Sequence, residues 1–164
     1  MAAIGLAGTQ MAQYKSGYQA LRKGRASIRN QIYLVTSTTR NRNPLFSEWR
    51  LASIACRNFE KDLLLKDATM LAWVLMPDHA HWLVQLGTQL ELGALMMRIK
   101  SAAAREINRT RNRKEPVWDR GFHDRALRQE EDIAATARYI VANPLRAGLV
   151  KRVGDYPYWN AIWL

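Results

Sequence analysis

Residues 71–86 read LAWVLMPDHAHWLVQL, and this stretch decides the fold. Two apolar runs flank Pro77 and Asp78, which predicts a hairpin of two strands joined by a short turn. Side chains alternate along a strand, so His79 and His81 point to the same face. Both imidazoles can then reach one divalent metal ion if a third ligand comes from elsewhere. The alternative is that one histidine lies in the core and the other on the surface.

The composition limits the classes of protein to which this chain can belong. The chain has 164 residues, 48% of them hydrophobic, and a net charge of +11. This length suits one domain with a core, and the charge predicts a polyanionic partner, nucleic acid first and an anionic membrane second. Cys56 is the only cysteine, which excludes an intrachain disulfide and fits a reducing cytosol. No apolar run reaches the roughly 20 residues that span a bilayer, so we expect a cytoplasmic, nucleoid-associated protein without a membrane partner.

The periodicity of apolar residues predicts the order β-α-β-β-α-β followed by a third helix. Strands are expected at residues 31–39, 69–76, 79–86 and 122–128, and helices at residues 47–66, 91–109 and 129–143. Ser47 is the expected N-cap of the first helix, and Leu63 belongs to its apolar stripe. This order predicts an α+β fold: a ferredoxin-like (RRM-like) antiparallel sheet with two helices on one face. The histidine pair and the third helix are expected on the other face.

Two basic segments are candidates for contact with a phosphate backbone. The first is an arm at about residues 18–30, which follows an expected flexible tail (1–17) and opens the single domain (18–164). The second is the predicted helix at 91–109 with the loop after it. The candidate DNA-binding residues are Arg22, Lys23, Arg25, Arg29, Arg98, Lys100, Arg105, Arg109, Arg111 and Arg113. A solvated surface without a ligand is the alternative for both segments.

Tyr139 and Asn143 are four residues apart on the third predicted helix, hence on the same side of it. A tyrosine beside a metal ion can act as a nucleophile toward phosphorus. Asn143 offers a carbonyl oxygen, a hard ligand that suits Mg²⁺ or Mn²⁺ and can complete a two-histidine site. Taken alone, a helical tyrosine is more often a core or interface residue, and an asparagine before proline is more often a helix stop.

Three blocks of this sequence resemble the REP-associated tyrosine transposases, bacterial relatives of the single-tyrosine HUH transposases. The blocks are His79-Ala80-His81, residues 117–127 (VWDRGFHDRAL) and residues 139–150 (YIVANPLRAGLV), in that order. The resemblance covers roughly residues 18 to 160. One departure is Ala80, because the middle residue of the first block is usually a bulky apolar one. That side chain should point away from the metal, so the change affects packing rather than ligation.

The resemblance implies a metal-dependent enzyme that cleaves and rejoins single-stranded DNA at hairpin-forming palindromes. His79 and His81 would hold Mg²⁺ or Mn²⁺, and Tyr139 would attack the scissile phosphate and form a 5′-phosphotyrosine intermediate. Asn143 would be the third ligand, although relatives often carry glutamine at this position. A monomer is favoured over a homodimer.

Two further residues are expected next to this site. Asp78 should orient the turn or a ligand imidazole. His123 would contact DNA, serve as an alternative ligand, or be a strand histidine with local hydrogen bonds. The alternative function for the whole chain is a non-catalytic nucleic-acid-binding protein on the same sheet.

Overall fold

Five antiparallel strands form one sheet, in the order β4-β1-β3-β2-β5, in the computed structural model, which describes residues 27–128 and 132–163. The strands are β1 (Ile32–Thr38), β2 (Thr69–Met76), β3 (His79–Gln85), β4 (His123–Ala126) and β5 (Trp159–Ala161). The predicted hairpin is confirmed as β2 and β3, and so are the α+β class and the antiparallel sheet. The tail at 1–17 and the arm residues Arg22, Lys23 and Arg25 lie outside the described residues.

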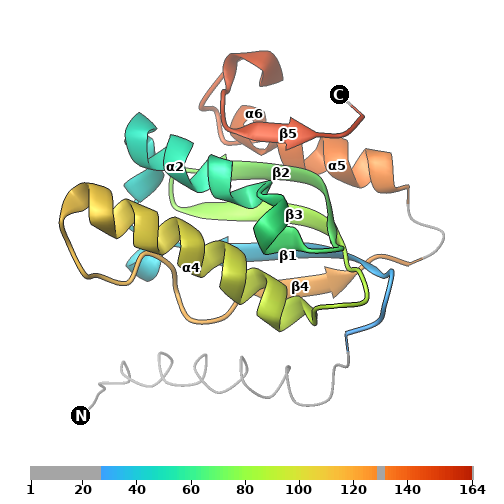
Figure 1. Cartoon of the computed structure of the whole chain (residues 1–164). Coiled ribbons are helices and arrows are strands. Elements are labelled where there is room, and N and C mark those ends of the chain that lie inside the picture. Colours follow the sequence, from blue (N-terminus) through green and yellow to red (C-terminus); the bar gives the residue numbers. More distant parts are fainter. Residues whose placement is uncertain (1–26, 129–131, 164) are drawn as a thin grey trace, which may run out of the picture.

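One face of the sheet is covered by α2 (Trp49–Phe59) and α4 (Leu92–Arg111), which lie side by side in front of it in Figure 1. Every second residue of β3 points into this layer, so Ala80, Trp82 and Val84 are fully buried. The apolar stripe predicted for the second helix is confirmed. Its buried residues are Leu92, Leu95, Met96, Ile99, Ala103 and Ile107.

The prediction of one continuous helix from Ser47 to Lys66 is wrong. Ser47 lies in a 3₁₀ turn, η2 (Leu45–Ser47), and Glu48 occupies the N-cap position without a capping side-chain bond. The helix ends after Phe59 because Lys61 adopts extended backbone angles, and the chain restarts as the short α3 (Asp62–Leu65). The break turns Leu63 outward, where it is 74% exposed instead of joining the apolar stripe.

The other face of the sheet is packed by α5 (Ile133–Val141) and the single turn α6 (Asn143–Arg146). Leu83 of β3 lies in a second apolar cluster with Ala137 and Ile140 of α5. Because Leu83 shares its face of β3 with the two histidines, α5 covers the histidine-bearing face. The third helix was expected to run to Asn143 and stop at Pro144; it ends earlier, at Val141, and Asn143 and Pro144 begin the separate α6.

Connecting turns and the last strand complete the fold. Two further 3₁₀ turns are η1 (Arg40–Arg42) and η3 (Val153–Asp155). At the edge of the sheet, β5 pairs with β2.

None of the helices in the part of the chain that the structure describes has both the length and the hydropathy needed to cross a bilayer.

Candidate functional site

The strand register aligns the candidate residues in rows across the sheet. His81 of β3 pairs with Thr36 of β1, and Thr36 pairs with His123 of β4. One step further along, His79 pairs with Thr38. Directly paired residues point to the same face, so these five side chains share the face that α5 partly covers. The sheet topology therefore brings residues together from three separate parts of the chain.

Asp78 fixes the orientation of the first imidazole. Nδ1 of His79 lies 2.6 Å from Oδ1 of Asp78, and Arg42 donates to the other carboxylate oxygen at 3.2 Å. Partial burial opposes ionisation of Asp78, but the hydrogen bond to His79 and the charges of His79 and Arg42 outweigh it and hold the carboxyl pKa below its usual range. The backbone carbonyl of Asp78 also accepts from the N–H of Thr39 at 2.8 Å, which anchors the turn to β1. Asp78 thus orients both the turn and an imidazole.

Thr36 plays the corresponding part for the second imidazole. Its hydroxyl lies 2.7 Å from Nδ1 of His81, and the two imidazole rings are 5.0 Å apart between centroids, nearly perpendicular at 86°. Burial, together with the charges of His79 and Arg146, lowers the pKa of His81 to about 4. His81 is therefore neutral at pH 7, the form in which an imidazole binds a metal ion.

The donor set fits a divalent metal ion. Each histidine uses Nδ1 toward an oxygen of the protein, and a histidine that binds metal through Nε2 needs such an acceptor for its Nδ1–H. Within residues 27–128 and 132–163, no three His, Cys, Asp or Glu side chains form a group that could hold a metal ion. His123 thus does not join the pair as a third ligand. A metal ion at this pair would need a further ligand of another type, and an amide oxygen is one such ligand.

Tyr139 lies on α5, the helix that packs on the histidine-bearing face, and its side chain is 62% exposed. It is thus neither a core residue nor shielded from a macromolecular ligand. Asn143 follows at the start of α6 and is half-buried. Its Nδ2 donates to the carbonyl of Ile140 at 2.7 Å, and its Oδ1 accepts from Arg146 at 2.8 Å. The amide oxygen expected to bind metal is therefore already fixed in direction.

Arg146 is the functional candidate that the sequence did not single out. Its guanidinium carbon lies 3.9 Å from the centroid of the Tyr139 ring, and the same group bonds to Asn143. Its spacing, seven residues after the tyrosine and three after the asparagine, was visible in the sequence. Helical spacing alone does not reveal this contact, because the helix breaks between α5 and α6.

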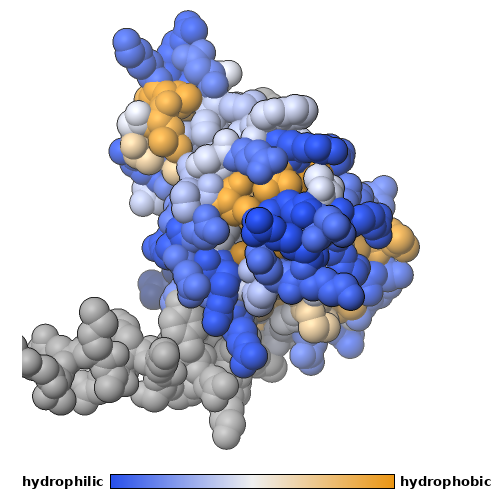
Figure 2. Space-filling view, turned by 90° about the vertical axis from the view of Figure 1, so that its left-hand side faces the viewer, coloured by the Kyte–Doolittle hydropathy of each residue, from blue (hydrophilic) through white to orange (hydrophobic). Residues whose placement is uncertain are grey.

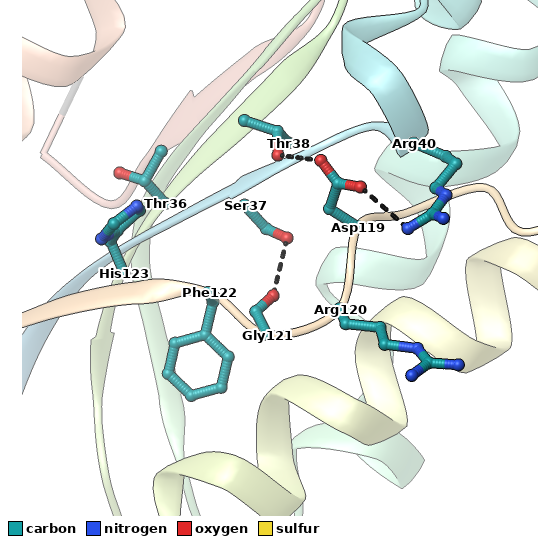
Figure 3. A pocket seen from close by; sticks show the side chains of 9 residues that line it. All are labelled: Thr36, Ser37, Thr38, Arg40, Asp119, Arg120, Gly121, Phe122 and His123. Carbon is teal, nitrogen blue, oxygen red and sulfur yellow. Dashed lines mark hydrogen bonds and ion pairs between the residues drawn. The ribbon is translucent and has the colours of Figure 1, made fainter. Parts of the chain in front are cut away.

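A pocket of about 260 Å³ opens between β1 and the loop that leads into β4 (Figure 3). Its lining residues are Thr36, Ser37, Thr38, Arg40, Asp119, Arg120, Gly121, Phe122 and His123. Asp119 accepts from the Thr38 hydroxyl at 3.0 Å and from Arg40 at 3.5 Å, as the dashed lines in Figure 3 mark. Because Thr36 also contacts His81, the pocket adjoins the candidate metal site.

Two of the predicted DNA-binding cations hold the fold together instead of standing free on the surface. Arg98 donates to the carbonyls of Leu63 and Leu64, at 2.8 and 3.2 Å, and so ties α3 to α4. Lys100 donates to the carbonyls of Asp119 and Gly121, which fixes the loop beside the pocket. These hydrogen bonds therefore give two of the positively charged side chains of α4 a structural role.

The other candidate cations within the described residues lie away from the histidine pair. Arg105 and Arg109 are exposed on α4, on the opposite side of the sheet, and Arg111 and Arg113 lie within 3.8 Å of Glu115. The end of the molecule that carries the C-terminal end of α4 faces the viewer in Figure 2, and hydrophilic residues cover most of it. Arg29 is exposed in the turn before β1, next to the end of β3 opposite His79.

Comparison with known proteins gives one family. A family model described as "Transposase IS200 like" matches residues 27–143. The chain is 31% identical over 94 residues to the "Putative REP-associated tyrosine transposase" of Haemophilus influenzae, and spans about half of that relative's length (53%). It is 25% identical over 135 residues to the REP-associated tyrosine transposase of Escherichia coli K12, covering 80% of this chain and 76% of that protein.

A solved structure shares the fold. It is a REP-associated tyrosine transposase bound to a REP hairpin, and it matches with a TM-score of 0.63 at 24% sequence identity. The match covers 82% of this chain and 79% of the other.

Proposed function

The chain belongs to the IS200-like transposase family, and on that basis we propose that it cleaves and rejoins single-stranded DNA at hairpin-forming sites. The observation that carries this proposal is the exposed Tyr139 on the helix that packs over the histidine-bearing face. An exposed phenol has no packing role to explain it. In the histidine pair, Nδ1 of each imidazole contacts an oxygen that can accept its proton, as in metal-binding histidines.

The proposed step is a transesterification. The hydroxyl oxygen of Tyr139 forms a bond to the scissile phosphorus, and the bond from phosphorus to the 3′ oxygen breaks. The phenol loses its proton to solvent, and the departing 3′ oxygen gains one, so the step is neutral overall. A 5′-phosphotyrosine link and a free 3′-hydroxyl result, and attack of a 3′-hydroxyl on the link reseals DNA without an outside energy source.

His79, His81 and Asn143 are the residues that would hold a Mg²⁺ or Mn²⁺ ion in this proposal. A divalent ion at these ligands would withdraw charge from the phosphate and so ease nucleophilic attack. Asp78 and Thr36 hold the two imidazoles in fixed orientations. The chain thus contributes ligand direction before any DNA arrives, which lowers the reorganisation needed for reaction.

Hairpin DNA is the substrate class that we propose. The relative with the same fold was solved with a REP hairpin, and this chain carries a net charge of +11. We infer that single-stranded DNA reaches the site beside the pocket at β1, where Arg40 and Arg120 offer charges to the backbone and His123 is an adjacent contact. Such binding should weaken steeply with salt, since released counterions drive it.

We also propose that a single chain carries the complete site. The helix with Tyr139 packs on β2 of its own chain through Ala137 and Ile140. A mixture of Tyr139→Phe and His81→Ala proteins tests this: it should form no adduct, because neither chain is complete. Restored adduct formation in the mixture would demonstrate exchange of the tyrosine helix between two chains.

The decisive experiment is an adduct assay. End-labelled hairpin DNA with single-stranded flanks is incubated with the protein and Mn²⁺ or Mg²⁺ and resolved under denaturing conditions. We expect a covalent adduct with the wild type, none with Tyr139→Phe, and an unchanged amount with Tyr158→Phe as a matched control. Mass spectrometry should place the nucleotide on Tyr139.

The second candidate function is a repeat-binding protein without catalysis. The positive charge of the chain favours it equally, because charge supports binding and says nothing about cleavage. Tight hairpin binding with no adduct and no cleavage, with either metal ion and across a panel of hairpins, would establish this alternative and overturn the enzyme.

A further inference from the structure

A single guanidinium group organises the region around the proposed nucleophile. Nη1 of Arg146 donates to the backbone carbonyl of Tyr139 at 2.7 Å, and Nη2 donates to Oδ1 of Asn143 at 2.8 Å. The guanidinium carbon lies over the face of the Tyr139 ring, 3.9 Å from its centroid. The stacking and the two hydrogen bonds are compatible because the guanidinium is planar and presents its donors as a fork.

The break between α5 and α6 explains why a side chain is needed there. Pro144 has no N–H, so the carbonyl of Ile140 cannot accept the usual helical bond from four residues on. The side-chain amide of Asn143 takes that place, with Nδ2 at 2.7 Å from the Ile140 carbonyl. Arg146 then bonds to the other end of the same amide. The Asn143 side chain is held at both ends, which selects one of its two amide orientations.

The fixed orientation directs the amide oxygen, not the nitrogen, toward Arg146. A carbonyl oxygen has two lone pairs, so Oδ1 can accept from a second partner while Arg146 occupies one of them. The ring of Tyr139 is restrained at the same time, because one of its faces is covered by the guanidinium. A single residue therefore sets the direction of the phenol and of the amide together.

We propose that Arg146 is a positioning residue, which holds the Tyr139 ring and the Asn143 amide oxygen in the geometry required for attack on the phosphate. This inference rests on the proposed function, and it names a residue whose role is distinct from those of the nucleophile and the metal ligands. The competing explanation is that Arg146 merely caps the carbonyl end of α5. A cap affects the stability of the fold, whereas a positioning residue affects the rate of reaction in folded protein.

Arg146→Lys separates the two explanations. Lysine keeps the positive charge and can still bond to one carbonyl, but it loses the planar fork and the stacked geometry. We expect the single-turnover rate of adduct formation at saturating hairpin DNA to fall by roughly 100-fold, the typical cost of small misplacements of reacting groups. Hairpin affinity should change little, and Arg146→Ala should lose at least as much rate as Arg146→Lys.

Arg138→Lys is the matched control. Arg138 is an exposed cation on α5, next to Tyr139 in the sequence, and it lies 3.7 Å from Asp132. We expect wild-type rates from this variant and equal thermal midpoints for the two lysine variants. If Arg146→Lys and Arg146→Ala both react at the wild-type rate, or if their loss of rate matches their unfolded fraction, Arg146 is a cap and the inference is overturned.

A second measurement does not depend on catalysis. In NMR spectra of the DNA-free protein, the ring of Tyr139 should shift the Arg146 side-chain signals upfield, and Tyr139→Ala should remove that shift. Arg146→Lys should change the ring signals of Tyr139 and the side-chain amide signals of Asn143, whereas Arg138→Lys should not. If the wild type forms no adduct, the proposed function fails. The contact of Arg146 with both residues is then still supported if Arg146→Lys changes the ring signals of Tyr139 and the side-chain amide signals of Asn143. It is refuted if either of these two sets of signals stays the same.

Discussion

The two faces of the sheet differ in how completely helices cover them. Beneath α2 and α4, the alternate residues of β3 (Ala80, Trp82 and Val84) are all fully buried. On the other face only Leu83 is buried, while His79 and His81 remain half-exposed. Because α5 and its short continuation protect only part of that face, polar side chains there keep access to solvent. Both faces carry buried apolar residues, but the incomplete cover of the histidine-bearing face leaves room for a site.

The polar and charged side chains on the two faces also make different kinds of hydrogen bond. Arg98 and Lys100, on the α4 side, donate to backbone carbonyls and so stabilise the fold. On the histidine side, hydrogen bonds to the side chains of Asp78, His81 and Asn143 fix the directions of nitrogen and oxygen atoms. The comparison indicates that substitutions on the first face should change stability, and those on the second should change activity.

The largest effect is expected from His81→Ala. Loss of an imidazole ligand should reduce adduct formation by roughly 1,000-fold or more, since a metal ion contributes several kcal/mol to such a reaction. Hairpin affinity should remain within a few-fold of the wild type, because phosphate contacts made elsewhere supply most of it. Single-turnover assays and binding titrations check this, and an equal loss of rate and affinity would instead indicate a folding defect.

Trp82→Ala changes the next residue of β3, which lies on the opposite face, and it should reduce the stability of the fold. Trp82 is fully buried and packs edge-on against Phe59 at 5.1 Å between ring centroids. Its truncation should lower the free energy of unfolding by about 3–5 kcal/mol, as measured by urea denaturation. Trp49→Ala is the control, since Trp49 is 71% exposed and its loss should cost under about 0.5 kcal/mol. Similar losses from both tryptophans would contradict the assignment of faces.

Asp78→Asn should weaken the metal site without removing a ligand. Asp78 holds Nδ1 of His79 at 2.6 Å, and loss of such an acceptor typically costs about 10–100-fold in metal affinity or activity. The measurement is the Mn²⁺ concentration that gives half the maximal adduct rate. Asp155→Asn, which alters an exposed pair with Arg152, should leave that concentration unchanged.

The lowered pKa of Asp78 sets the sign of its pH dependence. A carboxyl group with a lowered folded-state pKa stabilises the fold above its unfolded pKa of about 3.9, and that contribution disappears as the pH falls through the folded value. The wild-type metal requirement between pH 5 and 8 should therefore show no change that arises from titration of Asp78.

The smallest effect is expected from the exposed cations of α4. Replacing Arg105 and Arg109 together by alanine should weaken binding of every hairpin to the same modest extent and reduce the salt slope by at most about one unit per charge. Arg98→Ala should leave that slope unchanged and lower stability by about 1–3 kcal/mol, because two carbonyls lose their donor. If loss of Arg105 and Arg109 changed the preference between hairpin sequences, these two residues would not be acting only on the phosphate backbone.

Local pattern predicted much of this molecule. The hairpin at residues 71–86, the buried stripe of α4 and the shared face of His79 and His81 all follow from periods of two and 3.6 residues, which are properties of the backbone itself. The break after Phe59 was missed because apolar periodicity continues through it to Leu63, and only packing decides whether a helix bends there. The likeness of three short blocks also placed the chain in its family, which the family model confirms.

What the sequence by itself determined is which residues can share a face of one element. The order of the elements also predicted the position of the third helix on the histidine side. Only the tertiary structure decided that Thr36 meets His81 across 45 positions of the chain and that Arg146 folds back over Tyr139. Contacts of this kind depend on strand order and on where a helix breaks. These are fixed by burial of the whole core and not by any local period.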